Sequence, residues 1–367
     1  MKYKYLGNLI EASGKFHSTH VELSKKGSKV LFSMFKSLNP SDNIPLNIHK
    51  KLFDSLVKPI LMYNSEIWYM DFYEKIIKKQ LRANKSNTNF DILALLDSSF
   101  VEKVNLKFCK FVLGISKKSV NIAARAEISQ YPVDVYIKLQ VLKYLARISN
   151  NNNNPLLVDA YHLSKCLHSK GSYSWYSFTE NICSYNKIDM KDIENIDYKK
   201  EKCSFSKTIK NQLQENYEQL FFQKMKSLTD NNKLFLYSKV KTKYTTDPFL
   251  SDTNFENRRL LVKMRISDHN LEIETGRYNK ISREHHICKN CNQNRIEDEE
   301  HFFFHCSKNE ELRKELLDNI KQIHPNVKDI DNNILLTKIL SSSTVMQLAA
   351  PFIKKSLALR RVDSKDA

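Results

Sequence analysis

Glycine and proline are scarce in this chain, whose 367 residues contain 6 glycines and 8 prolines. These residue types end helices and make tight turns, so their scarcity favours long helices with short connections. Hydrophobic residues make up 41% of the chain, which is enough to bury a core. The length allows two or three domains at roughly 100–200 residues each. We therefore predict a mainly α-helical fold.

The first sixteen residues break the helical pattern. K-Y-K-Y-L-G-N-L-I combines β-branched and aromatic residues and is followed by Ser13-Gly14, which predicts a short β segment running into a turn. Beyond it, apolar residues recur at three- and four-residue steps. Helices are expected from Val21 to Asn39-Pro40, from Pro45 onward, over 100–113, over 119–129, after Pro132 and around 205–228. Pro59 lies inside the second of these helices and should kink or break it.

Positive charge is concentrated in the N-terminal part of the chain. The formal net charge is +18, and residues 1–150 carry 24 Lys+Arg against 12 Asp+Glu, whereas 151–254 carry 15 against 12 and 255–367 carry 20 against 17. Such a balance indicates a polyanionic partner, either nucleic acid or an acidic membrane surface. The alternative is a lysine-rich solvated surface that reflects biased composition. Five asparagines at 150–154 read as a linker after the basic segment.

The sequence lacks the signals of membrane and secreted proteins. It has no apolar run of ~18 residues, and its N-terminus has no apolar core or small-residue cleavage site of a signal peptide. Cys109, Cys166, Cys183 and Cys203 are scattered among an odd total of seven cysteines, which fits a reducing compartment. We expect an intracellular protein, in the nucleus or cytoplasm, that does not bind membranes.

A cysteine/histidine cluster lies in the last third of the chain. Cys288 and Cys291 are separated by two residues, and His301 and Cys306 follow. Two cysteines at this spacing can direct both thiolates to one point, and a later His/Cys pair completes the tetrahedral set that structural zinc prefers. Because protein would fill all four positions, the zinc should be structural and not catalytic. Accidental clustering of these residues is the alternative.

Several neighbours of this cluster could also bind a metal. His305 is a rival ligand, and His285 and His286 lie upstream. Asp298, Glu299 and Glu300 are interpreted as a solvated face whose charge favours zinc binding without contacting it. Ser307 and Glu310 have the spacing of a capping box, which predicts a helix just after the last ligand.

A second cluster is aromatic. Tyr173, Trp175, Tyr176 and Phe178 could form a stacking platform for bases. A local core is the favoured interpretation.

Several stretches resemble one known family. Y-K-Y-L-G, with Tyr5, Leu6 and Gly7, and L-F-D-S-L-V-K-P-I-L-M-Y followed by E-I-W are similar to the segment after the polymerase palm in reverse transcriptases of non-LTR, Jockey-like or LINE-type retrotransposons. L-V-K-M-R-I-S-D-H-N and I-E-D-E-E-H-F-F-F-H-C continue the resemblance to about residue 317. It implies a primer-grip strand, a helical thumb and the same CCHC zinc ligands.

The resemblance also identifies what the chain lacks. The family's palm aspartates hold two catalytic metal ions and include an adjacent pair, yet no Asp-Asp occurs in this sequence. Fingers, palm and endonuclease would lie before Met1, so we expect a C-terminal fragment of an RNA-directed DNA polymerase without polymerase activity of its own and without catalytic Mg²⁺. Two alternatives are a subunit that completes a reverse transcriptase in trans and a domesticated zinc-binding interaction protein with no nucleic-acid role.

On this interpretation the partners are RNA and DNA, held as a duplex through phosphate contacts in the parent polymerase. The candidate contact residues are Tyr5, Leu6, Gly7, Lys25, Lys26, Lys29, Lys50, Lys51, Lys58, Lys117 and Lys118. The predicted organisation is a primer-grip strand and thumb-like domain (1–149), the linker (150–154), a helical connecting region (155–254), a CCHC zinc-binding domain (255–325) and a partly helical tail (326–367). The zinc module could bind RNA or act as a structural clamp, and its near-neutral charge over 255–318 favours the clamp.

Overall fold

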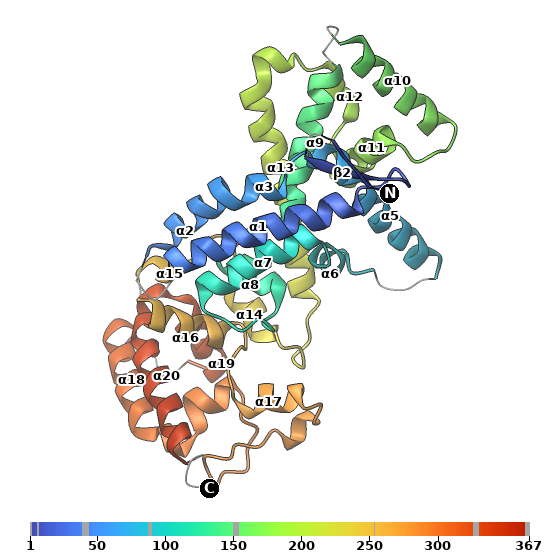
Figure 1. Ribbon diagram of the computed structural model, residues 1–367. Helices are drawn as coiled ribbons and strands as arrows, with labels where there is room; N and C mark the ends of the chain where they lie inside the picture. The colour runs from blue at the N-terminus through green and yellow to red at the C-terminus, as the bar shows by residue number, and fades with distance from the viewer. Residues whose placement is uncertain are drawn as a thin grey trace. The chain divides into compact units, whose positions relative to one another are not determined.

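The chain is mainly helical, with one β-hairpin at its N-terminus (Figure 1), which confirms the predicted fold class. The computed structural model describes residues 2–5, 7–38, 44–86, 90–149, 154–252, 254–325 and 330–363. Within these ranges no helix combines the length and the apolar character that crossing a bilayer requires.

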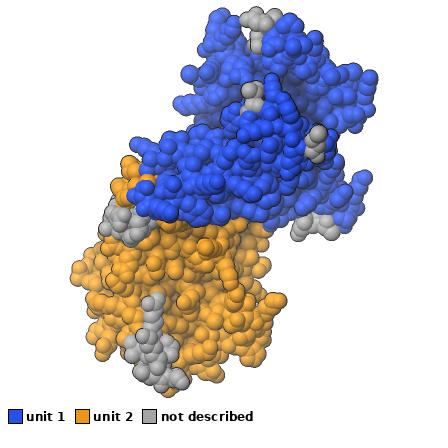
Figure 2. Space-filling view, in the orientation of Figure 1, with its two compact units in different colours: residues 1–37, 50–108, 131–221 blue, residues 38–49, 109–130, 222–367 orange. Residues whose placement is uncertain are grey.

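The chain folds into two compact units, coloured separately in Figure 2. Unit 1 comprises residues 1–37, 50–108 and 131–221, and unit 2 comprises 38–49, 109–130 and 222–367. Each unit is assembled from segments distant in sequence, whereas the sequence-based organisation used contiguous segments. That organisation stays a prediction, and residues 150–153 of its linker lie outside the described part of the chain.

The secondary structure follows these units. The elements of unit 1 are β1 (Lys2–Tyr5), β2 (Asn8–Glu11), α1 (His17–Ser37), the π-helix η2 (Phe53–Val57), α3 (Lys58–Leu61), α4 (Ser65–Trp68), α5 (Met70–Lys85), α6 (Ile92–Asp97), α9 (Val133–Ser149), α10 (Pro155–Ser169), α11 (Trp175–Tyr185) and α12 (Met190–Asn195). In the described part of the chain, three helices contribute residues to both units: α2 (Leu46–Leu52), α7 (Phe100–Leu113) and α13 (Tyr198–Lys226).

Unit 2 contains the remaining helices. They are α8 (Asn121–Glu127), α14 (Phe235–Val240), α15 (Phe249–Asp252), α16 (Phe255–Arg265), α17 (Glu272–Tyr278), η3 (Arg283–His285), η4 (His301–His305), η5 (Ser307–Asn309), α18 (Glu310–Ile323), α19 (Asn332–Ser341) and α20 (Ser343–Asp363). Helix α20 packs against α16, α18 and α19. Its Met346, Ala349, Ala350 and Ile353 are fully buried, so the segment predicted as a tail contributes to the core of this unit.

The N-terminal β segment is an antiparallel hairpin in which Lys2 pairs with Glu11 and Tyr5 with Asn8. Gly7 has a φ of +83°, a left-handed conformation that glycine adopts without the steric cost of a Cβ. The turn residue Leu6 lies outside the described residues.

Pro59 disrupts its helix as predicted. Residues 53–57 form a π-helical turn in which the Lys58 N–H bonds to the carbonyl of Phe53, and α3 follows. Proline has no N–H to donate and its ring crowds the preceding turn, so a local widening accommodates it. Beside this break, Gly27 lets α1 approach α3 closely, because a Cβ at Gly27 would overlap Leu61.

Other predicted boundaries agree with the structure in part. Helix α7 ends before Gly114, whose φ is +63°, and the helix predicted over 119–129 is the shorter α8. The described end of the asparagine run has a capping role, since the Asn154 side chain accepts a hydrogen bond from Leu157 N–H at the start of α10.

The aromatic residues around α11 belong to the core of unit 1. Phe178 is fully buried, and the Trp175 indole donates a hydrogen bond to the carbonyl of Glu66 at 2.8 Å. Tyr176 and Tyr161 contact each other with ring centroids 6.0 Å apart. The local-core interpretation therefore holds.

Candidate metal centre and basic surfaces

The four predicted ligands come together in unit 2. The ligand atoms of Cys288, Cys291, His301 and Cys306 all lie within 4.8 Å of one another. Cys288, His301 and Cys306 are buried and Cys291 is half-buried. His301 directs Nε2 toward the cluster, 3.4 Å from the sulfur of Cys291. Three sulfurs and one imidazole nitrogen at this spacing could hold a metal ion such as zinc.

A short antiparallel turn carries the first two ligands. Ile287 and Ile296 form an isolated β-bridge, and the Cys288 N–H bonds to the Arg295 carbonyl at 2.9 Å. Asn294, with a φ of +50°, lets the chain reverse within the intervening loop. The turn thus brings Cys288 and Cys291 to one side of a compact loop.

The π-helical turn η4 carries the third ligand. The His301 N–H bonds to the Asp298 carboxylate at 2.9 Å, and the Cys306 N–H bonds to the His301 carbonyl at 2.8 Å. Within η4, Phe302 and Phe303 contact Phe352 of α20, with ring centroids 5.7 and 5.2 Å apart. The phenylalanines beside the ligand therefore anchor the cluster to the core.

The predicted capping box after the last ligand does not form. Ser307 begins the 3₁₀ turn η5, and α18 starts at Glu310 behind Asn309 without a side-chain cap. The Asn309 side chain instead donates to the Phe302 carbonyl at 3.0 Å. The prediction of a helix close behind Cys306 was right, but its N-terminus is organised by contacts to η4, which local sequence spacing could not show.

The cysteine thiols influence one another's ionisation. A hydrogen bond to Cys306, followed by burial, raises the pKa of Cys288 to about 12. The same hydrogen bond lowers the pKa of Cys306, because it stabilises the thiolate. Sulfurs this close favour a shared proton or a shared cation, since neighbouring thiolates repel each other. A divalent ion would need these thiols deprotonated.

A buried ion pair flanks the cluster. Glu297 is fully buried, and both terminal nitrogens of the Arg360 guanidinium donate hydrogen bonds to its carboxylate. The carboxylate also accepts hydrogen bonds from Cys288 Sγ at 3.0 Å and from the Asn290 amide at 3.2 Å. Burial is the largest influence on Glu297 and opposes its ionisation, but the hydrogen bonds from Arg360 and Cys288 and the charge of Arg360 together outweigh it and lower the pKa. Arg360 lies 63 residues from Glu297 in sequence and places a positive charge beside the cluster. With zinc bound, the three thiolates would carry more negative charge than Zn²⁺ neutralises, so this positive charge is favourable.

The acidic run is not the solvated face that the sequence predicted. Glu299 is 9% exposed and accepts hydrogen bonds from Ser267 at 2.6 Å and His269 at 2.9 Å. Burial opposes its ionisation, but these bonds hold its pKa at about 2. Glu299 is buried because the acidic run turns into the core just before η4, where Ser267 and His269 contact it. The sequence of the run did not reveal this burial.

The rival histidines lie outside the four-residue cluster. His305 Nε2 is 3.5 Å from the Glu300 carboxylate, and exposed His285 contacts Ser282 at 2.8 Å. His286 is buried and its Nε2 contacts the Ile281 carbonyl at 3.0 Å. The cluster that could hold a metal ion therefore consists of the four residues named from spacing.

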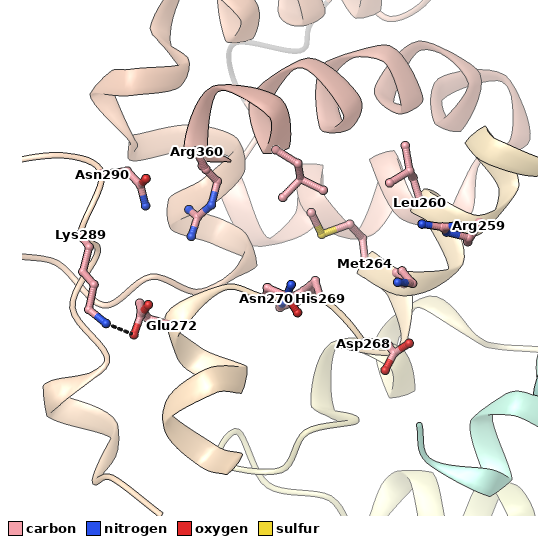
Figure 3. Close-up of a pocket in the computed structure, with 12 residues that line it drawn as sticks. Arg259, Leu260, Met264, Asp268, His269, Asn270, Glu272, Lys289, Asn290 and Arg360 are labelled. Atoms are coloured by element: carbon pink, nitrogen blue, oxygen red, sulfur yellow. Dashed lines mark hydrogen bonds and ion pairs between the residues drawn. The ribbon is translucent and has the colours of Figure 1, made fainter. Parts of the chain in front are cut away.

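A pocket of about 320 Å³ adjoins the Cys-x2-Cys turn (Figure 3). Lys289 and Asn290, which lie between the two cysteines, form part of its wall, and Arg259, Leu260 and Met264 of α16 line another part. Its charges are largely paired, as in the Lys289–Glu272 contact at 3.0 Å drawn in Figure 3.

The predicted nucleic-acid contacts are divided between the two units. Lys25, Lys26 and Lys29 are exposed on α1, where Lys26 pairs with Glu22, and Tyr5 is 57% exposed on the hairpin. Lys50 is half-buried and Lys51 exposed on α2. These residues and Gly7 belong to unit 1.

The other three lysines are engaged differently. Lys58 is largely buried, pairs with Asp54 and lies 3.8 Å from the Tyr136 ring centre. Lys117 and Lys118 are exposed but belong to unit 2, where Lys118 bonds to the Tyr278 hydroxyl at 2.8 Å. Lys58 is therefore a poorer phosphate ligand than the lysines of α1.

Comparison with protein-family models, with curated proteins and with solved structures finds no match. The family resemblance seen in the sequence therefore stays a hypothesis.

Proposed function

We propose that this chain binds nucleic acid through the exposed cations of unit 1 and that a structural zinc ion stabilises unit 2. The observation that carries the first part is the exposure of Lys25 and Lys29 on α1 without an ion pair among the described residues. Exposed lysines on a segment with net positive charge attract phosphates and release their counterions.

The zinc proposal rests on the four gathered ligand atoms. Because protein supplies all four, no coordination position is left for water or substrate, which is the arrangement of a structural site. The near-neutral charge of residues 255–318 favours a role as a structural clamp and not as a nucleic-acid-binding module.

We further propose descent from the C-terminal part of a non-LTR reverse transcriptase. The support is the K-Y-L-G, thumb-like and CCHC motifs, together with a hairpin at Tyr5 and Gly7 and a helix broken at Pro59. The protein is then expected to bind RNA and DNA without extending a primer, because the adjacent aspartates that hold catalytic metal are absent from the sequence.

Salt titration of binding tests the nucleic-acid proposal. Generic RNA or DNA should bind with an affinity whose logarithm falls linearly with the logarithm of salt concentration. A flat response, or no binding at low salt, would contradict phosphate contacts.

A second candidate is an interaction protein without a nucleic-acid role. On α10 the side chains of Leu156, Leu163 and Leu167 are 81%, 60% and 41% exposed. With Ala160 they follow a four-three-four spacing, which places them on one helix face. An apolar stripe of this kind suits a partner helix, and a flat salt titration would favour this candidate.

A further inference from the structure

A basic groove on unit 1 is lined by residues from the turn before α1, from helix α5 and from the start of α7. It encloses about 410 Å³, a volume within the range of ligand-binding clefts. Five cationic side chains line it: Lys15, Lys75, Lys78, Lys79 and Arg82. None of these belongs to the lysines that the sequence singled out.

Among the described residues, four of these five cations form no ion pair. Lys78 pairs with Glu74 at 2.6 Å, and the carboxylate of Asp71, the acidic residue of the lining, already accepts the Phe16 N–H at 2.6 Å. Lys15, Lys75, Lys79 and Arg82 form no ion pair among the described residues. Clustered, exposed cations repel one another, and a polyanion relieves that repulsion.

Aromatic rings form the floor of the groove. Phe72 and Phe100 are half-buried, and each packs edge-on against His20, with centroids 5.7 and 5.4 Å apart. His20 in turn stacks on Trp68 at 4.9 Å. Exposed His17 meets Phe100 at 5.6 Å. The rings support one another, so the floor is rigid.

His20 stays neutral beneath this floor. Its Nε2 accepts the Val101 N–H at 3.4 Å and contacts Ser99 Oγ at 3.1 Å. Burial lowers its pKa to about 3, with smaller contributions from His17, Lys75 and Lys103. The direction of these smaller effects agrees with a positive potential in the groove.

The cations of α5 follow one side of the helix. Lys75, Lys79 and Arg82 are spaced by four and three residues, so they lie on one face, and their backbone positions span about 10 Å. An extended strand presents more than one phosphate over that length. Cations along one wall and rings along the floor combine phosphate contacts with base stacking, the combination found in proteins that bind single strands.

We propose that this groove binds a single strand of nucleic acid, with phosphates on Lys75, Lys79 and Arg82 and a base stacked against His17 and Phe100. The proposal rests on the proposed nucleic-acid function and assigns it a site. A duplex keeps its bases paired and cannot use the aromatic floor, so the groove prefers unpaired strands.

The test measures binding of fluorescein-labelled oligothymidylate at pH 8 to two matched double variants. Lys75→Gln with Lys79→Gln removes two groove charges. Lys207→Gln with Lys210→Gln removes two exposed charges from α13 in the same unit. Lysine and glutamine have similar helix propensity, so both variants should fold. The groove variant should weaken binding on the order of tenfold and reduce the salt slope by about 1.4, while the control changes binding less than about twofold.

His17→Ala separates stacking from charge. It should weaken oligothymidylate binding about fivefold or more, yet leave binding of heparin, which has no bases, unchanged. The groove would be overturned as the binding site if the two double variants lost equal affinity, or if His17→Ala affected oligothymidylate and heparin equally. Either result would leave general nucleic-acid binding intact. A wild type that does not bind oligothymidylate, or binds it independently of salt, would overturn the proposed function itself.

Discussion

The buried cation Arg265 of unit 2 and the exposed lysines of α5 in unit 1 differ in how their charge is used. In unit 2, Arg265 is fully buried and contacts Glu127 at 2.8 Å, Asp247 at 2.6 Å and the Leu340 carbonyl at 2.6 Å. In unit 1, Lys75 and Lys79 are exposed and without ion pairs among the described residues. Buried charges need partners because desolvation is costly, so those of unit 2 are committed to structure. Exposed, unpaired charges add little to stability and remain available to a ligand.

The same contrast separates the two proposed sites. Around the cysteines, Glu297 and Arg360 form an ion pair that is shielded from solvent. Along α5 and α1, lysines point into solvent. Removing the buried charges of unit 2 should therefore affect folding, and removing the exposed cations of unit 1 should affect binding.

Loss of a cysteine ligand should have the largest effect. Cys288→Ser or Cys306→Ser is expected to release about one zinc per chain and to increase hydrogen exchange over residues 270–320. Structural zinc contributes on the order of 10 kcal/mol to small modules. Cys203→Ser, at an exposed cysteine on α13, is the matched control and should change neither quantity. A chelator that leaves the wild-type melting curve unchanged would argue against this part of the account.

Breaking the buried ion pair should have the next largest effect. Arg265→Met leaves Glu127 buried without its partner and should lower the free energy of unfolding by about 3–5 kcal/mol in denaturant titration. Lys354→Met removes a pair with Glu256 whose side chains are 55% and 59% exposed, and should cost less than about 1 kcal/mol. Similar losses in both variants would remove the contrast between buried and exposed charge.

Acid should destabilise unit 1 through His20. Burial lowers its pKa in the folded state to about 3 from 6.5, so the unfolded chain binds a proton that the folded chain does not. The stabilisation is complete above pH 6.5 and is lost as pH falls from 6.5 toward 3. Between pH 7 and pH 5 the expected loss is about 2 kcal/mol.

The measurement is denaturant unfolding of wild type and His20→Phe at several pH values. The variant keeps a ring in the aromatic floor but removes the titrating group, so its stability should depend less on pH. An unchanged pH slope would show that other groups govern the acid response.

Removing charge from α1 should have the smallest effect on folding. Lys25→Gln with Lys29→Gln is expected to change the free energy of unfolding by no more than about 0.5 kcal/mol. The same variant should weaken RNA binding and reduce its salt slope, whereas Lys207→Gln with Lys210→Gln should not. If the variant were clearly less stable but bound RNA normally when folded, these lysines would contribute to folding and not to binding.

Local sequence rules accounted for part of the molecule. Pro59 broke its helix because its missing N–H acts within one turn, and Gly114 ended α7 for an equally local reason. The four metal ligands were predictable because they lie within 19 consecutive residues and their spacing determines how they converge.

Features that depend on distant contacts were not predictable. The groove joins Lys15, Arg82 and Phe100 from three separate segments. Basic residues at 75, 78, 79 and 82, which follow the three- and four-residue steps of a helix, were a signal that could have drawn attention to α5. The burial of Glu299, and the bond from the Asn309 side chain to η4 where a Ser307 cap was expected, likewise depend on how η4 packs against its neighbours.

X-ray absorption spectroscopy of the zinc-loaded protein tests most directly whether unit 2 contains a structural zinc site. The cluster of Cys288, Cys291, His301 and Cys306 predicts three sulfurs at about 2.3 Å and one nitrogen at about 2.0 Å around each zinc. A shell of oxygen and nitrogen alone, or protein that retains no zinc after purification, would contradict a closed metal centre in unit 2.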